Sequence, residues 1–278
     1  MLKMKIALVQ TRTPATPEAA REHVLPLVRE AAAQGATFIA TPEGSNILQK
    51  DRAKLFPALK SLEDDPFVRG MRDAAKDLGV WILIGSALVK REDGKCANRA
   101  VLIDPEGAVT ATYDKLHMFD VDLPTGETAR ESESYEPGDR AVRADAGEAK
   151  LGLTVCYDLR FPALYRALAL AGAEIMTIPA AFTRPTGAAH WEILMRARAI
   201  ETGSFVLAPA QGGFHEDGRG TWGHTLAVGP WGEVLGCLDH DEPGVLVVDL
   251  DLAAAGKARR AIPALANARA FTGPEPSP

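Results

Sequence analysis

One cysteine, Cys156, lies where a nucleophile for acyl transfer could be placed. It ends a short β-prone run in the segment 151–162, LGLTVCYDLRFP, and a helix-like pattern begins at Phe161-Pro162. A thiol at such a strand–turn–helix junction would face the free N–H groups at the helix start, whose dipole favours the thiolate. The alternative is a small, buried hydrophobic residue, which is the commonest state of a free cysteine.

Two charged residues, Glu43 and Lys115, also follow predicted strands. Residues 37–41 and 108–113 have the pattern of those strands, and open α/β sheets place their sites at the carboxyl ends of strands. Taken alone, Glu43 fits a solvent-exposed loop residue better. Together with Cys156, the two residues would supply a base for the thiol proton, a cation for the oxyanion and an acid for the departing amine.

The elements that must position these residues alternate between strand and helix patterns, which predicts the α/β class. Expected strands cover residues 5–10, 37–41, 80–89, 96–104, 108–113, 141–155, 174–178, 204–209, 221–228, 233–237 and 244–250. Expected helices cover residues 18–34, 65–79, 161–171 and 190–202, with a short helix after 251. Residues 116–140 form a long connection without periodicity, which we expect to be an ordered loop that covers the site.

Composition and charge restrict the partners and the compartment. The 278-residue chain has a net charge of -6 and scattered Lys and Arg, which argues against nucleic acid and anionic membranes. Its three cysteines suggest a reducing compartment, and no stretch reaches membrane-span length, so we expect a cytoplasmic protein. Dispersed histidines and the lack of glycine-rich nucleotide motifs predict no cofactor and no metal. We expect one domain over residues 1–272 and a loose Pro-rich tail at 273–278.

Several sequence motifs around these residues resemble those of the carbon–nitrogen hydrolases, the nitrilase superfamily. The motifs are TPEG at 41–44, DKLHMFD at 114–120, RESESYEPGD at 130–139 and VCYDLRFP at 155–162, with longer stretches at 179–202 and 222–236. They cover nearly the whole chain and are most similar to the Nit branch, whose members are amidases. The resemblance implies a four-layer αββα sandwich. It also implies a homodimer or larger homo-oligomer, because a second copy often packs against one helical layer.

The resemblance assigns a role to each reactive residue. Cys156 would be the nucleophile, Glu43 the general base, and Lys115 the oxyanion stabiliser and proton donor. Glu131 would help to orient the base and the substrate, and the N–H of Tyr157 would join Lys115 in binding the oxyanion. The implied reaction is hydrolysis of a small acidic α-keto amide, first of all deaminated glutathione, through a thioester that releases ammonia or an amine.

Fold and catalytic residues do not determine the substrate, so other activities remain open. An ω-amidase acting on α-ketoglutaramate, an N-carbamoyl amino acid hydrolase and a nitrilase could all use the same Cys, Glu and Lys. Outside the enzymes, the chain could be a binding or scaffold protein that kept the fold, against which the intact set of reactive residues argues.

Further residues near the predicted site have two interpretations each. Phe182, Thr183 and Arg184 follow a predicted strand beside the pocket, where the arginine could bind a substrate carboxylate or lie on the surface. Asp158 and Arg160 could pair with each other or with neighbouring loops, and we favour a structural role.

The remaining cysteines and the charges of one helix are assigned to structure. Cys96 and Cys237 are interpreted as packing residues. The charged residues of the expected helix 190–202 are interpreted as ion-pair and dimer-interface residues: Glu192, Arg196, Arg198 and Glu201.

Overall fold

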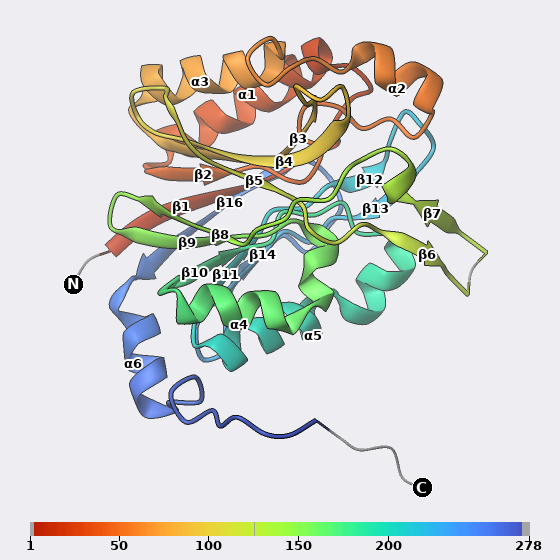
Figure 1. The fold of residues 1–278 in the computed structure, drawn as a ribbon. Coiled ribbons are helices and arrows are strands. Elements are labelled where there is room, and N and C mark those ends of the chain that lie inside the picture. The colour runs from red at the N-terminus through yellow and green to blue at the C-terminus, as the bar shows by residue number, and fades with distance from the viewer. Residues whose placement is uncertain (1–2, 125, 274–278) are drawn as a thin grey trace, which may run out of the picture.

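Two β-sheets packed face to face form the centre of the computed structural model, which describes residues 3–124 and 126–273 (Figure 1). Helices cover the outer face of each sheet, so that the layers follow the order helix, sheet, sheet, helix. Each sheet thereby buries both of its faces. This is the αββα sandwich predicted from the sequence.

The first sheet has six strands in the order β16-β1-β2-β3-β4-β5. Strands β1, β2 and β3 are parallel, and β16, β4 and β5 pair antiparallel with their neighbours. Burial on both faces explains why β3 is apolar along most of its length, WILIGSALVK. The bounds are Lys3–Gln10 for β1, Phe38–Ala40 for β2, Trp81–Lys90 for β3, Cys96–Ile103 for β4, Val109–Asp114 for β5 and Gly244–Asp251 for β16.

The second sheet has six strands in the order β15-β14-β11-β10-β9-β8, of which β9, β10 and β11 are parallel. Leu8 and Phe38 of the first sheet share one buried cluster with Leu151 and Ile175 of the second, so the sheets form a common core. The bounds are Val142–Ala146 for β8, Ala149–Leu153 for β9, Ile175–Thr177 for β10, Phe205–Ala208 for β11, Leu226–Val228 for β14 and Val234–Cys237 for β15.

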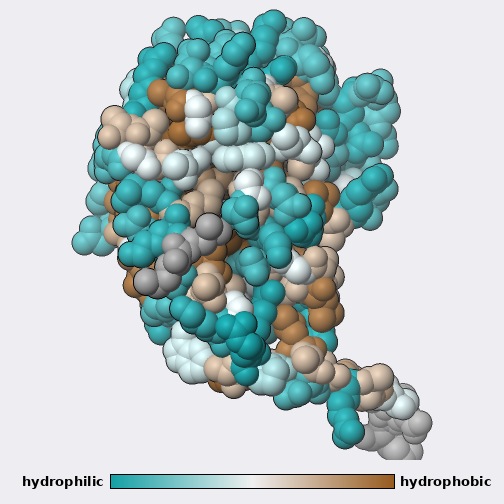
Figure 2. Space-filling view, turned by 90° about the vertical axis from the view of Figure 1, so that its left-hand side faces the viewer, coloured by the Kyte–Doolittle hydropathy of each residue, from teal (hydrophilic) through white to brown (hydrophobic). Residues whose placement is uncertain are grey.

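Helices α1 and α3 lie on the outer face of the first sheet, and α4 and α5 on that of the second (Figure 1). Val24 and Val28, at helical spacing in α1, pack in one cluster with Ile39 and Ile82 of the first sheet. Figure 2 shows one side of the molecule, where hydrophilic residues predominate and hydrophobic residues form small separate groups. The helix bounds are Pro17–Ala33 for α1, Arg52–Ala58 for α2, Pro66–Leu78 for α3, Pro162–Leu170 for α4, Arg184–Thr202 for α5 and Ala253–Ala261 for α6.

The long connection 116–140 contains elements that the sequence did not indicate. Strands β6 (Asp120–Asp122) and β7 (Thr128–Arg130) form a hairpin that projects from the body, and a 3-10 turn, Glu131–Glu133, follows it (Figure 1). Three-residue strands are too short for an alternating pattern to be recognised. The short α2 was missed because its 7 residues give no apolar period.

Helix α5 begins at Arg184 rather than at residue 190 as predicted. Gly187 weakened the helical pattern in the sequence, but packing requires it, because a Cβ there would lie 2.2 Å from the Trp222 side chain. The apparent helix breaker is therefore a close contact inside a helix.

The predicted strand 221–228 is in fact two strands. Strand β13 (Gly220–Trp222) pairs with β12 (Gly212–Phe214) in a small separate sheet, whereas β14 belongs to the second large sheet. The left-handed backbones of Gly223 (φ 70) and His224 (φ 57) turn the chain between them.

The predicted tail at 273–278 lies, apart from Gly273, outside the described residues. Within residues 3–124 and 126–273, no helix combines the length and the apolar character needed to cross a membrane. In the same ranges, no three or more His, Cys, Asp and Glu side chains are grouped so that they could hold a metal ion.

Candidate active site

Glu43 is held just beyond the end of β2 by a tight turn. The N–H of Gly44 donates to Ser86 Oγ (2.8 Å), which fastens this turn to β3. At the same point β3 presses so closely against the turn that a Cβ on Gly85 would lie 2.0 Å from the Thr41 carbonyl oxygen. A glycine is therefore needed there, and the turn directs Glu43 inward until only 8% of the residue is exposed.

Lys115 follows β5 and has only 2% of its surface exposed. Its Nζ donates to Glu43 Oε1 (2.9 Å) and to Oε2 and Oε1 of Glu131 (2.8 and 3.0 Å). Its backbone N–H donates to the Asn98 carbonyl (3.0 Å), which fixes the start of the side chain. The structure thus gathers two of the predicted carboxylates around one buried cation.

Glu131 reaches this cluster from the 3-10 turn at the base of the β6–β7 hairpin. The N–H of Phe119, at the start of the same hairpin, donates to Glu131 Oε2 (2.7 Å). The carboxylate therefore connects the hairpin to Lys115, and it can orient both.

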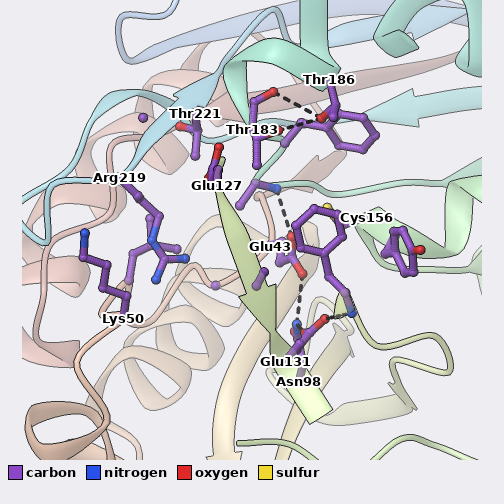
Figure 3. A pocket seen from close by; sticks show the side chains of 18 of the residues that line it. Glu43, Lys50, Asn98, Glu127, Glu131, Cys156, Thr183, Thr186, Arg219 and Thr221 are labelled. Carbon is purple, nitrogen blue, oxygen red and sulfur yellow. Dashed lines mark hydrogen bonds between the residues drawn. The ribbon is translucent and has the colours of Figure 1, made fainter. Parts of the chain in front are cut away.

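Asn98 connects the two carboxylates, and the sequence reasoning missed it. Its Nδ2 donates to Glu43 Oε1 (2.9 Å) and to Glu131 Oε1 (3.0 Å) (Figure 3). Its Oδ1 is buried and has no hydrogen-bond partner among the described residues. The available signal was an amide inside the largely apolar strand CANRAVLI, since a buried amide needs partners.

Cys156 occupies a sharp turn soon after β9, with a left-handed backbone (φ 49) that residues other than glycine rarely adopt. Its N–H donates to the Pro179 carbonyl (2.9 Å). The helix predicted at 161–171 is present as α4, which begins at Pro162, but a 3-10 helix, Cys156–Arg160, precedes it, so the thiol does not face the start of α4 as expected. The dipole of α4 does not stabilise the thiolate, since this effect falls off within the first turn.

Burial and the neighbouring charges set the protonation states of the cluster. Burial would raise the pKa of Glu43, but the Lys115 ammonium and the hydrogen bonds that the carboxylate accepts hold it below its ordinary value. Burial and the Glu43 carboxylate raise the pKa of Cys156 well above that of an ordinary thiol, while Lys115 opposes them. Burial would lower the pKa of Lys115, but Glu131 and Glu43 raise it well above its usual value. The resting site therefore holds a neutral thiol beside an ionised carboxylate, as general-base activation requires.

A cavity of about 810 Å³ opens onto this cluster, and every site residue predicted from the sequence lines it: Glu43, Lys115, Glu131, Cys156, Tyr157, Phe182, Thr183 and Arg184. Within the described residues, the Tyr157 N–H has no protein acceptor, so this donor can face a bound substrate. Phe182 packs edge to face on Trp191, with ring centroids 5.1 Å apart, and forms part of the wall. The Thr183 hydroxyl lies 2.7 Å from that of Thr186.

The two arginines near the predicted pocket differ in how far the protein itself uses them. Arg184 pairs with Asp241 and lies over the Phe214 ring, 5.2 Å from its centroid. Among the described residues, the side chain of Arg160 has only the His190 ring as a hydrogen-bond partner (3.3 Å). Arg160 therefore keeps more donors for a substrate carboxylate.

Asp158 does not pair with Arg160, which was one of the two interpretations. It is fully buried, accepts from the Tyr113 hydroxyl (2.7 Å) and the Val155 N–H (2.8 Å), and lies 2.7 Å from His117 Nδ1. These contacts join the segment after Lys115 to the turn of the cysteine, so Asp158 has the structural role that we favoured.

Cys96 is buried as predicted, but Cys237 is exposed on the edge strand β15, and its interpretation as a packing residue is wrong. The sequence pattern alone could not distinguish an edge strand from a covered one. The ion pairs expected on α5 both form, between Arg196 and Glu192 and between Arg198 and Glu201.

Comparisons with known proteins agree with this geometry. The family described as carbon-nitrogen hydrolase matches residues 5–260. A Yersinia enterocolitica protein named deaminated glutathione amidase is 42% identical over 238 residues, which cover 84% of this chain and 82% of that protein. The solved structure of the C. elegans NitFhit protein superposes with a TM-score of 0.88 at 29% identity, over 96% of this chain and 65% of that one. A mutant amidase from Nesterenkonia sp. AN1, with acrylamide added at its active-site cysteine, gives a TM-score of 0.76 at 28% identity, over 93% and 98%.

Proposed function

The chain belongs to the carbon–nitrogen hydrolase family and is an amidase, and we propose that it cleaves a small acidic α-keto amide, deaminated glutathione first of all. One observation carries the proposal: the buried Lys115 ammonium holds two carboxylates beside the Cys156 thiol. A nucleophile, a base and an oxyanion donor are thereby present in one place.

Acylation begins when Glu43 takes the thiol proton and the Cys156 sulfur attacks the amide carbon. The C–S bond forms, and the oxyanion accepts hydrogen bonds from Lys115 and from the Tyr157 N–H. The proton held by Glu43 then passes to the amide nitrogen, directly or through Lys115. The C–N bond breaks and the amine leaves a thioester on the cysteine.

Deacylation repeats the same proton transfers with water as the nucleophile. Glu43 takes a proton from the water, the C–O bond forms, and the oxyanion is bound as before. The C–S bond breaks, Cys156 regains its proton from Glu43, and the carboxylic acid departs. The site returns to the neutral thiol and ionised carboxylate of the resting enzyme.

Two observations support the substrate class. The Yersinia relative carries the name of a deaminated glutathione amidase, and Arg160 offers donors to a carboxylate close to the nucleophile. A nitrile forms no oxyanion on the first attack, so donors arranged for an oxyanion favour amides. α-Ketoglutaramate, the substrate of an ω-amidase, shares the keto-acid half of deaminated glutathione and is the second candidate.

The test is a comparison of kcat/KM over a panel of amides, carbamoyl compounds and nitriles. The values should fall in the order deaminated glutathione, α-ketoglutaramate, glutamine, with nitriles last. A highest value for an N-carbamoyl amino acid or for a nitrile would contradict the substrate assignment and leave the chemistry of the cysteine intact.

We further propose a homodimer or larger homo-oligomer, formed at the outer face of α5 and the adjacent strand β15. The support is a set of exposed apolar side chains on these elements and the turn before β15: Ile193, Ile200, Trp231, Val234 and Leu235. Sedimentation of the purified protein checks this proposal, and a monomer at micromolar concentration would contradict it.

We also propose that the protein is cytoplasmic and that residues 1–272 form a single domain. In support of the first, the cysteines Cys96, Cys156 and Cys237 are all free. In support of the second, the family match spans residues 5–260 without a break.

A further inference from the structure

Lys50 and Arg219 form a cationic pair on the cavity wall that the proposed reaction does not use. Both line the cavity, on the side away from Cys156, with Glu43 between (Figure 3). One carboxylate holds them together, because Asp217 Oδ2 accepts from the Lys50 N–H (2.9 Å) and from Arg219 Nε (2.8 Å). The Asp217 side chain is 1% exposed, so the anchor of the Lys50–Arg219 pair is buried.

The side-chain donors of Lys50 and Arg219 that face the cavity have no acceptor within residues 3–124 and 126–273. Lys50 Nζ lies over the turn that contains Asp217 and Gly218, 3.6 Å from the place where a Cβ on Gly218 would stand. Among the described residues, no carboxylate pairs with Lys50 Nζ, and the Nη groups of Arg219 have no hydrogen-bond partner. Asp217 balances one of the two positive charges, so the Lys50–Arg219 pair presents about one net charge to the cavity.

Apart from Arg160, which lies on the Cys156 side, the other arginines on the wall are bound by the protein. Arg130 pairs with Asp122 and Arg184 with Asp241. Two adjacent cations with unused donors are a suitable site for a carboxylate, because a guanidinium and an ammonium can each donate to it.

The place of Glu43 indicates which end of the substrate meets the Lys50–Arg219 pair. Glu43 must return its proton to the departing nitrogen, so this nitrogen lies beside its carboxylate. The leaving group then continues away from Cys156, toward Lys50 and Arg219. The acyl part stays near Arg160, at the end of the 3-10 helix that Cys156 begins.

We propose that Lys50 and Arg219 bind a carboxylate at the far end of the leaving amine. The preferred substrates are then amides whose leaving group is an amino acid or a short peptide, rather than amides that release ammonia. This inference rests on the proposed amidase function, whose first substrate, deaminated glutathione, has such a leaving group, and it assigns the residues that bind the carboxylate of that group. The cavity of about 810 Å³ has room for a substrate that extends on both sides of the scissile bond.

Two compounds isolate the carboxylate: deaminated glutathione and its C-terminal carboxamide. Wild-type kcat/KM should be about tenfold or more higher for the carboxylate compound, chiefly through a lower KM, as expected for a charge-assisted hydrogen bond. Lys50→Met and Arg219→Gln should bring this ratio close to one, and Lys50→Arg should restore much of it. Lys54→Met is the matched control, because Lys54 lies on α2, is exposed and does not line the cavity.

The outcomes separate this inference from the proposed function. Equal wild-type kcat/KM for the two compounds, or an equal loss for both in Lys50→Met, would overturn the Lys50–Arg219 pair as a carboxylate site and leave the amidase function standing. Hydrolysis of neither compound would overturn the proposed function, and this inference with it. Lys50→Met is the decisive variant, since methionine keeps the backbone N–H that Asp217 binds.

Discussion

The two ends of the cavity carry their charges in opposite ways. At the inner end, the buried Lys115 ammonium is already bonded to Glu43 and Glu131. On the outer wall, Lys50 and Arg219 keep donors that no acceptor meets within the described part of the chain. Buried charges are costly unless they are paired, so the inner end is complete before a substrate arrives, whereas the outer wall is completed by the substrate.

The two ends of the cavity therefore have different tasks: the inner residues carry out the reaction, and the outer residues discriminate between substrates. The inner groups meet only the scissile bond, so they act alike on every amide that reaches them. The outer donors meet a remote part of the substrate and can favour one leaving group over another. Substitutions at the inner end should therefore slow the carboxylate and carboxamide compounds by the same factor.

Cys156→Ala should have the largest effect, because it removes the attacking sulfur. Turnover of both compounds should be abolished while the fold persists, as checked by steady-state assays and circular dichroism. Mass spectrometry of the wild type on a slow substrate should find an acyl adduct at Cys156 and at neither Cys96 nor Cys237. Retained activity in the variant would exclude the cysteine mechanism.

Glu43→Gln keeps the shape of the side chain but removes its ability to take a proton. We expect kcat to fall about a hundredfold or more for both compounds, while KM changes little. Separate measurement of kcat and KM checks this. A kcat near that of the wild type would mean that another group is the base.

Lys115→Met should be similarly damaging, because the oxyanion loses its charged donor. It also leaves Glu43 and Glu131 buried without their cation, so the melting temperature should fall as well. Thermal denaturation beside the Lys54→Met control measures this second effect. If Lys115→Met has the melting temperature and the turnover of the control, Lys115 neither stabilises the two buried carboxylates nor binds the oxyanion.

Glu131→Gln should reduce kcat less than Glu43→Gln does, by about tenfold, because an orienting group is lost rather than the base. Both variants are measured in one assay series with both compounds. The reverse order of effects would show that the roles of the two carboxylates are exchanged.

The pH dependence of activity should show the smallest of these effects. The pKa of Glu43 is held below the ordinary value of 4.5, so its carboxylate is still mostly ionised when the pH has fallen to 4.5. Activity on both compounds should be lost only as the pH passes through this lowered pKa. A kcat/KM profile that falls near neutrality would instead indicate a base with a raised pKa.

The inner end could be anticipated from the sequence, whereas the outer wall could not. Lys115 directly follows β5, Glu43 and Cys156 come shortly after β2 and β9, and each strand end could be located from local patterns. Asn98 was missed because a single amide in a strand does not reveal what it will face. Lys50 was missed because only the fold brings it next to Arg219.

Long-range pairing also bears on the interpretations that the sequence left open in the predicted site. The interpretation of Arg184 depends on Asp241, and that of Asp158 on Tyr113, partners that no local pattern connects. The fold class needed less information, because it follows from the alternation of strands and helices. Short elements such as α2 and the β6–β7 hairpin lie below the length at which a period is visible.

The left-handed backbone of Cys156 sets stability against function. A residue with a Cβ in this conformation costs about 1 kcal/mol relative to glycine, a noticeable share of the small margin by which proteins stay folded. Cys156→Gly would relieve this strain, but it would remove the sulfur. Selection for thermal stability alone would therefore favour the more stable but inactive Cys156→Gly variant. The cysteine is retained only while catalytic activity is also under selection.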